Sequence, residues 1–600
     1  MKEFPPFRLD TVNQCLWRGD QRVPLRPKGF SVLQYLVEHA GRLVSRRELL
    51  DALWPGTFVE PEVLKSHILD IRSALGDNAK NPAFVETQPR RGYRFVADVS
   101  EAADPSVSRG LSPEKLVGWQ DSAGVTEPDG IARIATKPID ALAVLPFVNA
   151  GGDPETDYLS EGITESIINN LSQLSAIRVV SRNSAFRYKG REGDHAAIRR
   201  ELGVSAVVTG RVLQRGESLT VGAELVDITL NRQLWGERYH RKFSEIFAVQ
   251  EDIATQISDK LRLRLTRTQK ERLLRRYTSN RQAYHLYLKG RYLWSRRTPR
   301  SLNLAVDCFQ QAIQEDPFYA LAYAGLADGY NLLGWYGFLT PRESLQRSEA
   351  SAAKALQIDP ELAEAHAALG FSKACGHDWA GGETALRRAL QINPNYWLGY
   401  DWRALSLAGM GGAAEAITTI RRAQQIDPLS LLIFHHSAWV YIQARLYSEA
   451  LEQCRRALEL EPNYPWAHLW LGLACTETGM HAEAIAALRK ALDILGSVPF
   501  AVAALAHAHT RAGHPSEADN YLDQLANENQ LYVDPYHLSL IHAGLGRLNQ
   551  AVDCLEKAYR DSSMWFAMWA RLDPRLDPLR GIGRFDDLLR RMAVESSVTN

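Results

Sequence analysis

Residues suited to recognising a charged, hydrogen-bonding surface gather at two places in the N-terminal part of the chain. A segment of helical period presents four outward positions, which are Lys65, Ser66, Leu69 and Asp70. A later turn carries the adjacent guanidinium groups of Arg90 and Arg91. Lysine and arginine pair with phosphates and guanine edges, and an aspartate accepts a hydrogen bond from a cytosine amine. By role, Lys65 and Ser66 are the best candidates to contact base edges, and Asp70 suits a cytosine.

Three predicted helices and a hairpin are the elements that must hold these side chains. The first helix opens at Pro27 and has one apolar face, formed by Phe30, Leu33, Leu36 and Val37. Ser45-Arg46-Arg47-Glu48 is a capping box that starts a second helix, which ends near Trp54-Pro55-Gly56. Pro61 opens the third helix, which carries the outward positions and stops at Gly76. FVETQ, the turn Pro89-Arg90-Arg91-Gly92 and YRFVADV then predict a β-hairpin with two arginines at its tip.

This order of elements predicts a winged helix, in which a helix fits the major groove of B-DNA and a thin hairpin lies along or in the minor groove. Residues 1–99 carry 15 Lys and Arg against 12 Asp and Glu, an excess of only three. Attraction to phosphate must therefore come from a cluster, formed by Arg72, Arg90, Arg91 and Arg94. Any one of these arginines alone fits a solvated surface as well, and it is their combination with the order of elements that favours DNA.

Three stretches of this region resemble the DNA-binding C-terminal domain of OmpR/PhoB-type transcription regulators: PLRPKGFSVLQYLVEHAGRLVSRRELLDALWP, VLKSHILDIRSALGD and VETQPRRGYRFV. The resemblance covers almost all of residues 4–99. It implies contacts to the DNA backbone from Trp54, His67, Arg72 and Thr87, and Tyr93 matches an aromatic residue at the base of the hairpin. Pro89 stands where the family has a minor-groove arginine, so this form is closer to the ToxR/CadC/HilA branch. Which bases are read stays open.

The composition of the whole chain excludes binding by overall charge. Lys and Arg number 70 and Asp and Glu number 70, so nucleic-acid binding depends on a local patch. Six scattered cysteines without a CxxC pair predict small buried side chains in a reducing compartment. The N-terminus lacks the apolar stretch of a secretion signal, and no run approaches the ~18 apolar residues of a membrane span. We expect a soluble, cytoplasmic protein without membrane contact.

A different pattern follows the winged helix. Residues 100–137 lose periodicity and gain Pro, Gly, Ser and acidic residues, which is typical of a flexible linker. Within residues 138–270, the apolar run ALAVLPFV predicts a buried strand, and helices, a second strand and a three-stranded meander follow it. This α/β region resembles the TolB N-terminal-like domain found beside tetratricopeptide arrays in many bacterial regulators.

The α/β region offers little evidence for catalytic or ligand-binding residues. Gly151-Gly152-Asp153 could belong to a phosphate-binding loop, but a plain turn is favoured, because neither GxxxxGK[ST] nor GxGxxG is present. Asp157, Glu161 and Glu165 share one helix face, where a solvated surface is favoured over a metal site. The chain shows no nucleophile–base–orienter set and no metal-ligand spacing. We therefore expect no catalytic residue, no cofactor and no metal.

A fixed period of 34 residues marks the C-terminal half. It is kept by five alanines, Ala355, Ala389, Ala423, Ala457 and Ala491, and by four prolines, Pro360, Pro394, Pro428 and Pro462. This period and the small residues at its helix crossings resemble tetratricopeptide repeats, in about seven or eight units over residues 279–595. Seven aromatics are dense here: Trp335, Tyr336, Trp397, Trp402, Trp439, Trp466 and Trp470. Most suit packing between helices, and the rest suit a groove for a peptide or a partner helix.

The predicted fold class is a multi-domain chain: an α+β winged helix, an α/β middle domain and an all-α TPR solenoid. The predicted function is a one-component, sequence-specific DNA-binding regulator of transcription and not an enzyme. Its expected partners are double-stranded DNA, a protein or peptide in the TPR groove, and a second copy on DNA. Two alternatives stay open, a nucleotide-handling, cyclase-like module and a scaffold whose winged helix binds protein.

Overall fold

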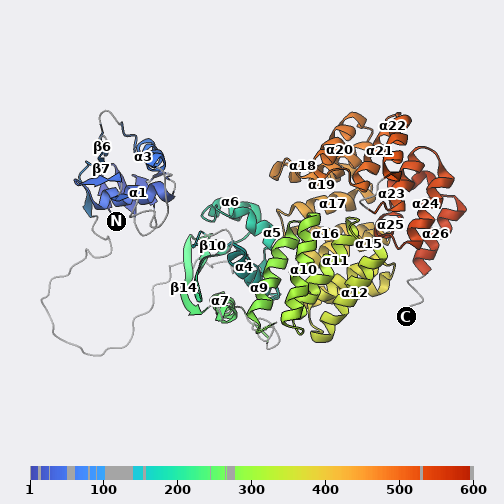
Figure 1. Cartoon of the computed structure of the whole chain (residues 1–600), viewed down its shortest axis with the longest axis horizontal. Helices are drawn as coiled ribbons and strands as arrows, with labels where there is room; N and C mark the ends of the chain where they lie inside the picture. The colour runs from blue at the N-terminus through green and yellow to red at the C-terminus, as the bar shows by residue number, and fades with distance from the viewer. Residues whose placement is uncertain are drawn as a thin grey trace, which may run out of the picture. The chain divides into compact units, whose positions relative to one another are not determined.

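The computed structural model describes residues 2–10, 15–19, 21–23, 25, 27–46, 48–49, 61–78, 82–88, 91–101, 139–152, 157–242, 245–261, 263, 265–266, 278–527 and 532–594. The chain forms two compact units, one within residues 1–133 and one within residues 134–600 (Figure 1). The predicted linker at 100–137 lies outside the described residues except for Ser100 and Glu101.

An antiparallel sheet in the first unit precedes the predicted helices. Its order is β4-β3-β2-β1-β8, and its strands are β1 (Lys2–Phe4), β2 (Phe7–Asp10), β3 (Cys15–Arg18), β4 (Gln21–Val23) and β8 (Ser100–Glu101). Phe4, Phe7, Leu9 and Leu16 point from it into the core. The ring of Phe4 packs edge-on against Phe95 with centroids 5.0 Å apart. The sheet therefore forms one wall of the core on which the hairpin rests.

The remainder of the first unit follows the predicted order. It comprises α1 (Pro27–Glu38), β5 (Leu43–Ser45), α3 (Pro61–Leu75), β6 (Val85–Gln88) and β7 (Gly92–Phe95). The predicted apolar face of the first helix is confirmed, since Phe30, Leu33, Leu36 and Val37 are all buried in one cluster. The backbone N–H of Glu48 donates to Ser45 Oγ at 3.1 Å, as a capping box requires. Positions 50–60 lie outside the described residues.

The hairpin of β6 and β7 is extended by β5 into a three-stranded sheet, in the order β5-β7-β6. Gly92 is required at the start of β7, because a Cβ there would lie 2.0 Å from the carbonyl oxygen of Val44 on β5. Any side chain at this position would push the two strands apart. The glycine of the PRRGY turn thus lets the hairpin close tightly on the body of the domain.

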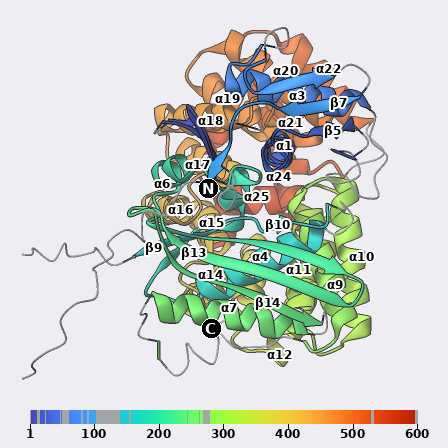
Figure 2. The same ribbon diagram turned by 90° about the vertical axis from the view of Figure 1, so that its left-hand side faces the viewer.

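A mixed sheet forms the middle of the chain, in the order β11-β9-β12-β13-β14 with β10 beside β12 (Figure 2). Its elements are β9 (Ala141–Val144), β10 (Val148–Asn149), α4 (Asp157–Ser172), β11 (Arg178–Val179), α5 (Arg182–Ala185), η2 (Phe186–Tyr188), α6 (His195–Leu202), β12 (Ala206–Arg215), β13 (Ser218–Asp227), β14 (Arg232–Lys242) and α7 (Ile246–Lys260). Alternate residues of β9 face opposite sides. Leu142 and Val144 join the core under α4 and α7, whereas Ala141 and Ala143 join the core under α5 and α6.

The acidic face of α4 is engaged in ion pairs, and the predicted solvated surface is wrong for Glu161 and Glu165, whose side chains are only 11% and 12% exposed. Its carboxylates Asp157, Glu161 and Glu165 are paired with three basic side chains, namely Lys189, Arg182 and Arg291. The shortest of these contacts joins Arg182 Nη2 to Glu161 Oε2 at 2.7 Å. The prediction failed because the partners come from α5, the following loop and α9, which sequence spacing does not bring to this face.

Eight helix pairs make up the described part of the solenoid between residues 281 and 560 (Figure 1). They are α9 (Arg281–Ser295) with α10 (Pro299–Glu315), α11 (Ala320–Trp335) with α12 (Pro341–Ile358), α13 (Ala363–Cys375) with α14 (Trp379–Ile392), α15 (Trp397–Gly409) with α16 (Ala413–Ile426), α17 (Leu431–Gln443) with α18 (Tyr447–Leu460), α19 (Pro465–Glu477) with α20 (His481–Leu495), α21 (Pro499–Arg511) with α22 (Pro515–Ala526), and α23 (Pro535–Gly544) with α24 (Leu548–Arg560).

The small residues at the helix crossings are needed for close approach. A Cβ on Gly370 of α13 would lie 2.9 Å from the carbonyl oxygen of Gly382 on α14. One on Gly472 of α19 would meet Leu488 of α20 at 2.4 Å. The predicted reason for the repeat's small positions is therefore confirmed at these crossings. Five of the six cysteines are buried and Cys554 is partly buried, as expected for small apolar side chains.

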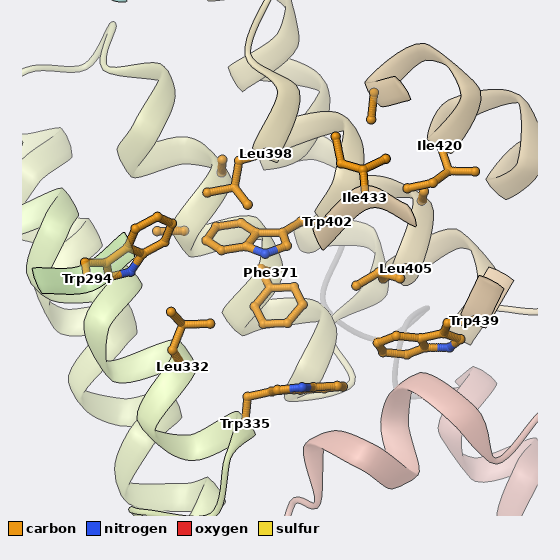
Figure 3. Packing of buried hydrophobic residues seen from close by; sticks show 14 of the residues in the cluster. Trp294, Leu332, Trp335, Phe371, Leu398, Trp402, Leu405, Ile420, Ile433 and Trp439 are labelled. Carbon is orange, nitrogen blue, oxygen red and sulfur yellow. The ribbon is translucent and has the colours of Figure 1, made fainter. Parts of the chain in front are cut away.

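A short helix after the last pair packs onto the aromatic residues of the solenoid. It is α25 (Met564–Trp569), and η4 (Pro574–Leu579) and α26 (Gly583–Val594) follow it. Trp565 stacks on Trp335 with centroids 4.5 Å apart and donates from Nε1 to the carbonyl oxygen of Trp335. Trp569 stacks on Trp439 and Trp470. Figure 3 shows how Trp335, Trp402, Phe371 and Trp439 converge in this core. The expected packing role is confirmed for Trp335, Trp402, Trp439 and Trp470, which are all buried.

Turns between successive repeats hold the α/β region against the solenoid. Asn393 Nδ2 donates to Ser172 Oγ at 2.9 Å. One repeat later, Asp427 accepts from the backbone N–H of Ser184 at 3.0 Å. One repeat further on, Arg187 donates to the carbonyl oxygen of Leu460 at 2.9 Å. The 34-residue period thus presents equivalent turns at regular intervals, and α4, α5 and η2 each use one of them.

Candidate nucleic-acid interface

The outer face of α3 carries the side chains that the sequence assigned to bases. Leu64, Ile68 and Ile71 fill the core, and the opposite face presents Lys65 and Leu69 to solvent. Leu69 is 58% exposed. Asp70 and His67 lie half-buried at the two edges of this face, and Ser66 belongs to the same helix. One side of α3 is therefore anchored and the other is open to a partner.

Arg72 and Thr87, both expected at the DNA backbone, are brought together by the fold. Arg72 is only 8% exposed, near the C-terminal end of α3. Its Nη2 donates to the carbonyl oxygen of Val85 at 2.7 Å and to Thr87 Oγ1 at 2.8 Å. Because Val85 and Thr87 belong to β6, this guanidinium ties the recognition helix to the hairpin. Arg72 therefore fixes the position of one element against the other.

Asp77 is a second tie between α3 and the hairpin, and sequence reasoning missed it. Its carboxylate accepts hydrogen bonds from the backbone N–H groups of Ala83 at 2.7 Å and Val85 at 2.8 Å. It thereby shapes the connection from the end of α3 to the start of β6. The available signal was its place directly after the helix stop at Gly76, where aspartate favours side-chain-to-backbone turns.

The hairpin presents one described arginine at its tip. Arg91 is exposed, and its backbone N–H donates to the carbonyl oxygen of Gln88 at 3.0 Å, which closes the turn. Arg94 lies further down β7 and pairs with Glu86 across the strands at 3.6 Å. Tyr93 is 3% exposed and belongs to the core beneath the hairpin. Trp54 and Arg90, the other expected contact residues, lie outside the described residues.

The start of the second helix is fixed by an ion pair. Arg42 and Tyr35 both donate to the carboxylate of Glu48. Burial acts to raise the pKa of Glu48, but these bonds and one from the Ser45 backbone outweigh it and hold the pKa below its usual value. Glu48 therefore stays ionised near neutral pH. The neighbouring Arg46 is exposed.

Together these residues form a surface that combines cations with one apolar side chain. Lys65, Leu69 and Arg91 are exposed, and Arg72 and Asp77 hold their two elements in register. Such a surface suits a partner with phosphates and base edges. In the part of the chain that the structure describes, no cluster of His, Cys, Asp or Glu is placed to hold a metal ion. Nor does any described helix have the length and apolar character to cross a membrane.

Family models match both ends of the chain. Residues 20–95 match the family "Transcriptional regulatory protein, C terminal". Residues 441–497 and 536–560 match tetratricopeptide repeat families. The expected OmpR/PhoB-type domain and the expected TPR array are therefore confirmed. The resemblance of the middle region to the TolB N-terminal domain stays a prediction.

Curated relatives match parts of the chain. "Putative adenylate cyclase 3" of Rhizobium meliloti is 36% identical over 220 residues, 36% of this chain and 37% of that protein. "Transcriptional regulator HilA" of Salmonella typhi is 24% identical over 400 residues, 64% of this chain and 63% of that protein. "Transcriptional activator CadC" of Escherichia coli is 31% identical over 90 residues, 15% of this chain and 17% of that protein. The chain thus spans less than two thirds of the length of each.

Proposed function

We propose that this chain, which begins with an OmpR/PhoB-type winged helix and ends in tetratricopeptide repeats, is a one-component regulator of transcription that acts in the cytoplasm. The observation that carries the proposal is the exposed face of Lys65 and Leu69 on α3, tied by Arg72 to a hairpin whose tip is Arg91. The matched family and the regulators HilA and CadC support it.

In the proposed complex, α3 enters the major groove and the hairpin follows the neighbouring phosphates or minor groove. Lys65, Ser66 and Asp70 contact base edges, and His67 and Thr87 face the backbone. Trp54, Arg90 and Arg91 supply further backbone contacts. Tyr93 and Arg72 act chiefly by positioning the hairpin, because both are buried. A second copy of the chain occupies an adjacent half-site.

The TPR array is the proposed input for a protein or peptide signal. Repeats of this kind present extended surfaces to partners. The aromatic residues of its inner layer already pack on α25, so a peptide that uses this groove must displace α25 or bind beside it. Binding of a partner then changes how two copies share their half-sites on DNA.

Mapping the full-length chain on the chromosome of the cell that makes it tests this function. We expect discrete sites, and transcription of neighbouring genes should change when the chain is deleted. The double variant Lys65→Ala/Arg91→Ala should lose these sites at an unchanged protein level. A scaffold whose winged helix binds protein would leave no sequence-specific sites, and that result would reject the proposal.

A nucleotide-handling activity of the middle region is the second candidate. It is favoured by the 36% identity of 220 residues of this chain, at positions that the match does not specify, to a protein named as a putative adenylate cyclase. Against it stands the absence of a Gly-rich phosphate-binding motif in the sequence. Incubating the full chain with ATP and Mg²⁺ and following cyclic nucleotide formation tests it. Turnover above that of a heat-denatured sample would establish the second candidate.

A further inference from the structure

Leu69 is an apolar side chain at the centre of the exposed face of α3. The core positions of this helix are taken by Leu64, Ile68 and Ile71, so Leu69 adds nothing to the interior. Its exposed fraction is 58%, whereas Val96, the next large apolar side chain in the described part of the first unit, is 40% exposed. Most of the apolar surface of Leu69 thus remains available to a partner.

The surroundings of Leu69 favour a nucleic acid as that partner. Lys65 lies one turn earlier on the same face and Ser73 one turn later, and both are exposed. Arg91 is exposed at the tip of the hairpin that Arg72 ties to this helix. An isolated leucine flanked by polar and basic groups is unlike the broad apolar patch of a protein interface. It fits a surface that is mostly charged and carries small apolar groups.

We propose that Leu69 reads the C5-methyl group of a thymine in the major groove. This inference rests on the proposed function and deepens it. In the major groove only thymine presents an apolar group, and the other base edges present donors and acceptors. A leucine facing these polar edges would desolvate them without a hydrogen bond, which disfavours every other base. Leu69 therefore specifies an A·T pair.

Helix geometry places this pair relative to the base read by Lys65. Four residues of an α-helix rise about 6 Å, and successive base pairs are about 3.4 Å apart. The thymine read by Leu69 therefore lies about two base pairs from the position that Lys65 contacts when α3 follows the groove. The predicted site thus contains a guanine read by Lys65 and a thymine about two base pairs from it.

Removing single methyl groups from DNA tests the proposal. The full-length chain is first used to select its preferred duplex from a random pool. Each thymine of that duplex is then replaced in turn by deoxyuridine, which removes only the C5-methyl group. Affinities are measured for the wild type, for Leu69→Ala and for the matched control Val96→Ala, which removes an exposed apolar side chain elsewhere in the same unit.

We expect one thymine whose replacement weakens wild-type binding about fourfold, the change that corresponds to about 0.8 kcal/mol for one buried methyl-sized group. Leu69→Ala should bind the thymine and deoxyuridine duplexes equally, and Val96→Ala should keep the wild-type difference. Equal sensitivity to deoxyuridine in Leu69→Ala and wild type would overturn the inference while DNA binding stands. Loss of self-association in Leu69→Ala without any deoxyuridine effect would also overturn it, because Leu69 would then contact a second copy. Failure of the wild type to select any duplex would instead reject the proposed function.

Discussion

Among single residues, two arginines that look equivalent in the sequence differ in how deeply the structure buries them. Arg72 and Arg91 both belong to the predicted basic cluster, and the family resemblance adds a backbone contact for Arg72. In the structure Arg72 is 8% exposed and is bonded to β6, whereas Arg91 is exposed at the turn. No periodicity distinguishes them, because the acceptors of Arg72 lie on a strand that follows a separate loop. Replacing Arg91 and replacing Arg72 should therefore have different effects, the first on DNA affinity and the second on the stability of the hairpin.

Replacing Arg91 should weaken DNA binding without loosening the domain. Arg91→Ala removes one exposed cation, so the slope of log affinity against log salt should fall by about one. Hydrogen exchange of the hairpin should match the wild type. The affinity of the full-length chain for its selected duplex over a salt series measures the slope. An unchanged slope would show that Arg91 does not contact phosphate.

Replacing Arg72 should instead loosen the hairpin. Arg72→Ala leaves the buried Val85 carbonyl group and the half-buried Thr87 Oγ1 without this donor, and the loss at the buried carbonyl costs about 1–3 kcal/mol. Amides of β6 and β7 should exchange faster, while amides of the solenoid serve as the internal control. Wild-type exchange in the hairpin, together with weaker DNA binding, would mean that Arg72 acts directly on DNA.

At the scale of elements, the sequence predicted those features that local spacing determines. The 34-residue period predicted the helix pairs, and the small residues at fixed positions of the repeat predicted close helix crossings, which the structure shows at Gly370 and Gly472. The packing of α25 and the ion pairs on α4 were not predictable in this way. Both join segments far apart in the chain, such as Trp565 with Trp335 and Arg291 with Glu165. For the same reason the spacing did not reveal that repeat turns hold the α/β region.

Removing Asp427 should release α5 from the solenoid. This buried carboxylate accepts from the Ser184 N–H and from Asn183 Nδ2 at 2.9 Å. Burial raises its pKa, against the lowering effect of side-chain hydrogen bonds from neighbouring residues such as Ser184 and Asn183. In Asp427→Ala these donors lose their acceptor, at a cost of about 1–3 kcal/mol each. Amides of residues 182–188 should exchange faster, whereas those of α22 should not change. Equal exchange at both places would show that the turn does not hold α5.

Acid should open the packing of α25. Burial lowers the pKa of His537 to about 3, and its ring lies 5.1 Å from that of Trp565. An unfolded histidine binds a proton near pH 6.5, so the folded form loses stability as pH falls below 6.5 and keeps it fully above. Between pH 6.5 and about pH 3, the free energy of unfolding falls by about 1.4 kcal/mol per pH unit. Charged Arg575 adds to the lowering.

Tryptophan fluorescence between pH 7.5 and pH 4, in about half-unit steps, follows this opening. His537→Phe cannot take up the proton, so its acid transition should move to lower pH. His514→Phe, at an exposed position, should leave the transition in place. An unmoved transition in His537→Phe would show that another group controls the acid response.

In the whole molecule, the two proposed functions, DNA binding and signal input, belong to two compact units. The first unit has its own core, built from the N-terminal sheet, α1, α3 and the hairpin. The core of the second unit runs through the α/β region and the solenoid without a break. The α/β region and the solenoid therefore share one packed core, and sequence reasoning, which treated them as separate domains, did not show this continuity.

Removing the second unit should leave DNA binding intact and abolish the regulated response of the target genes. Residues 1–133 alone should keep the affinity of one winged helix for one half-site, because that unit has its own core. They should lose the regulated response of the target genes, which the account assigns to the second unit. A reporter gene under a mapped site measures the response. A normal response from residues 1–133 would remove the solenoid from the mechanism.

The most direct test of the central claim is the preference of the full-length chain for one DNA sequence. Its affinity for the selected duplex is compared at physiological salt with that for a scrambled duplex of equal length and composition. We expect at least about a thousandfold tighter binding to the selected duplex. Equal binding to both would contradict it, because a surface that only attracts phosphate cannot regulate chosen genes.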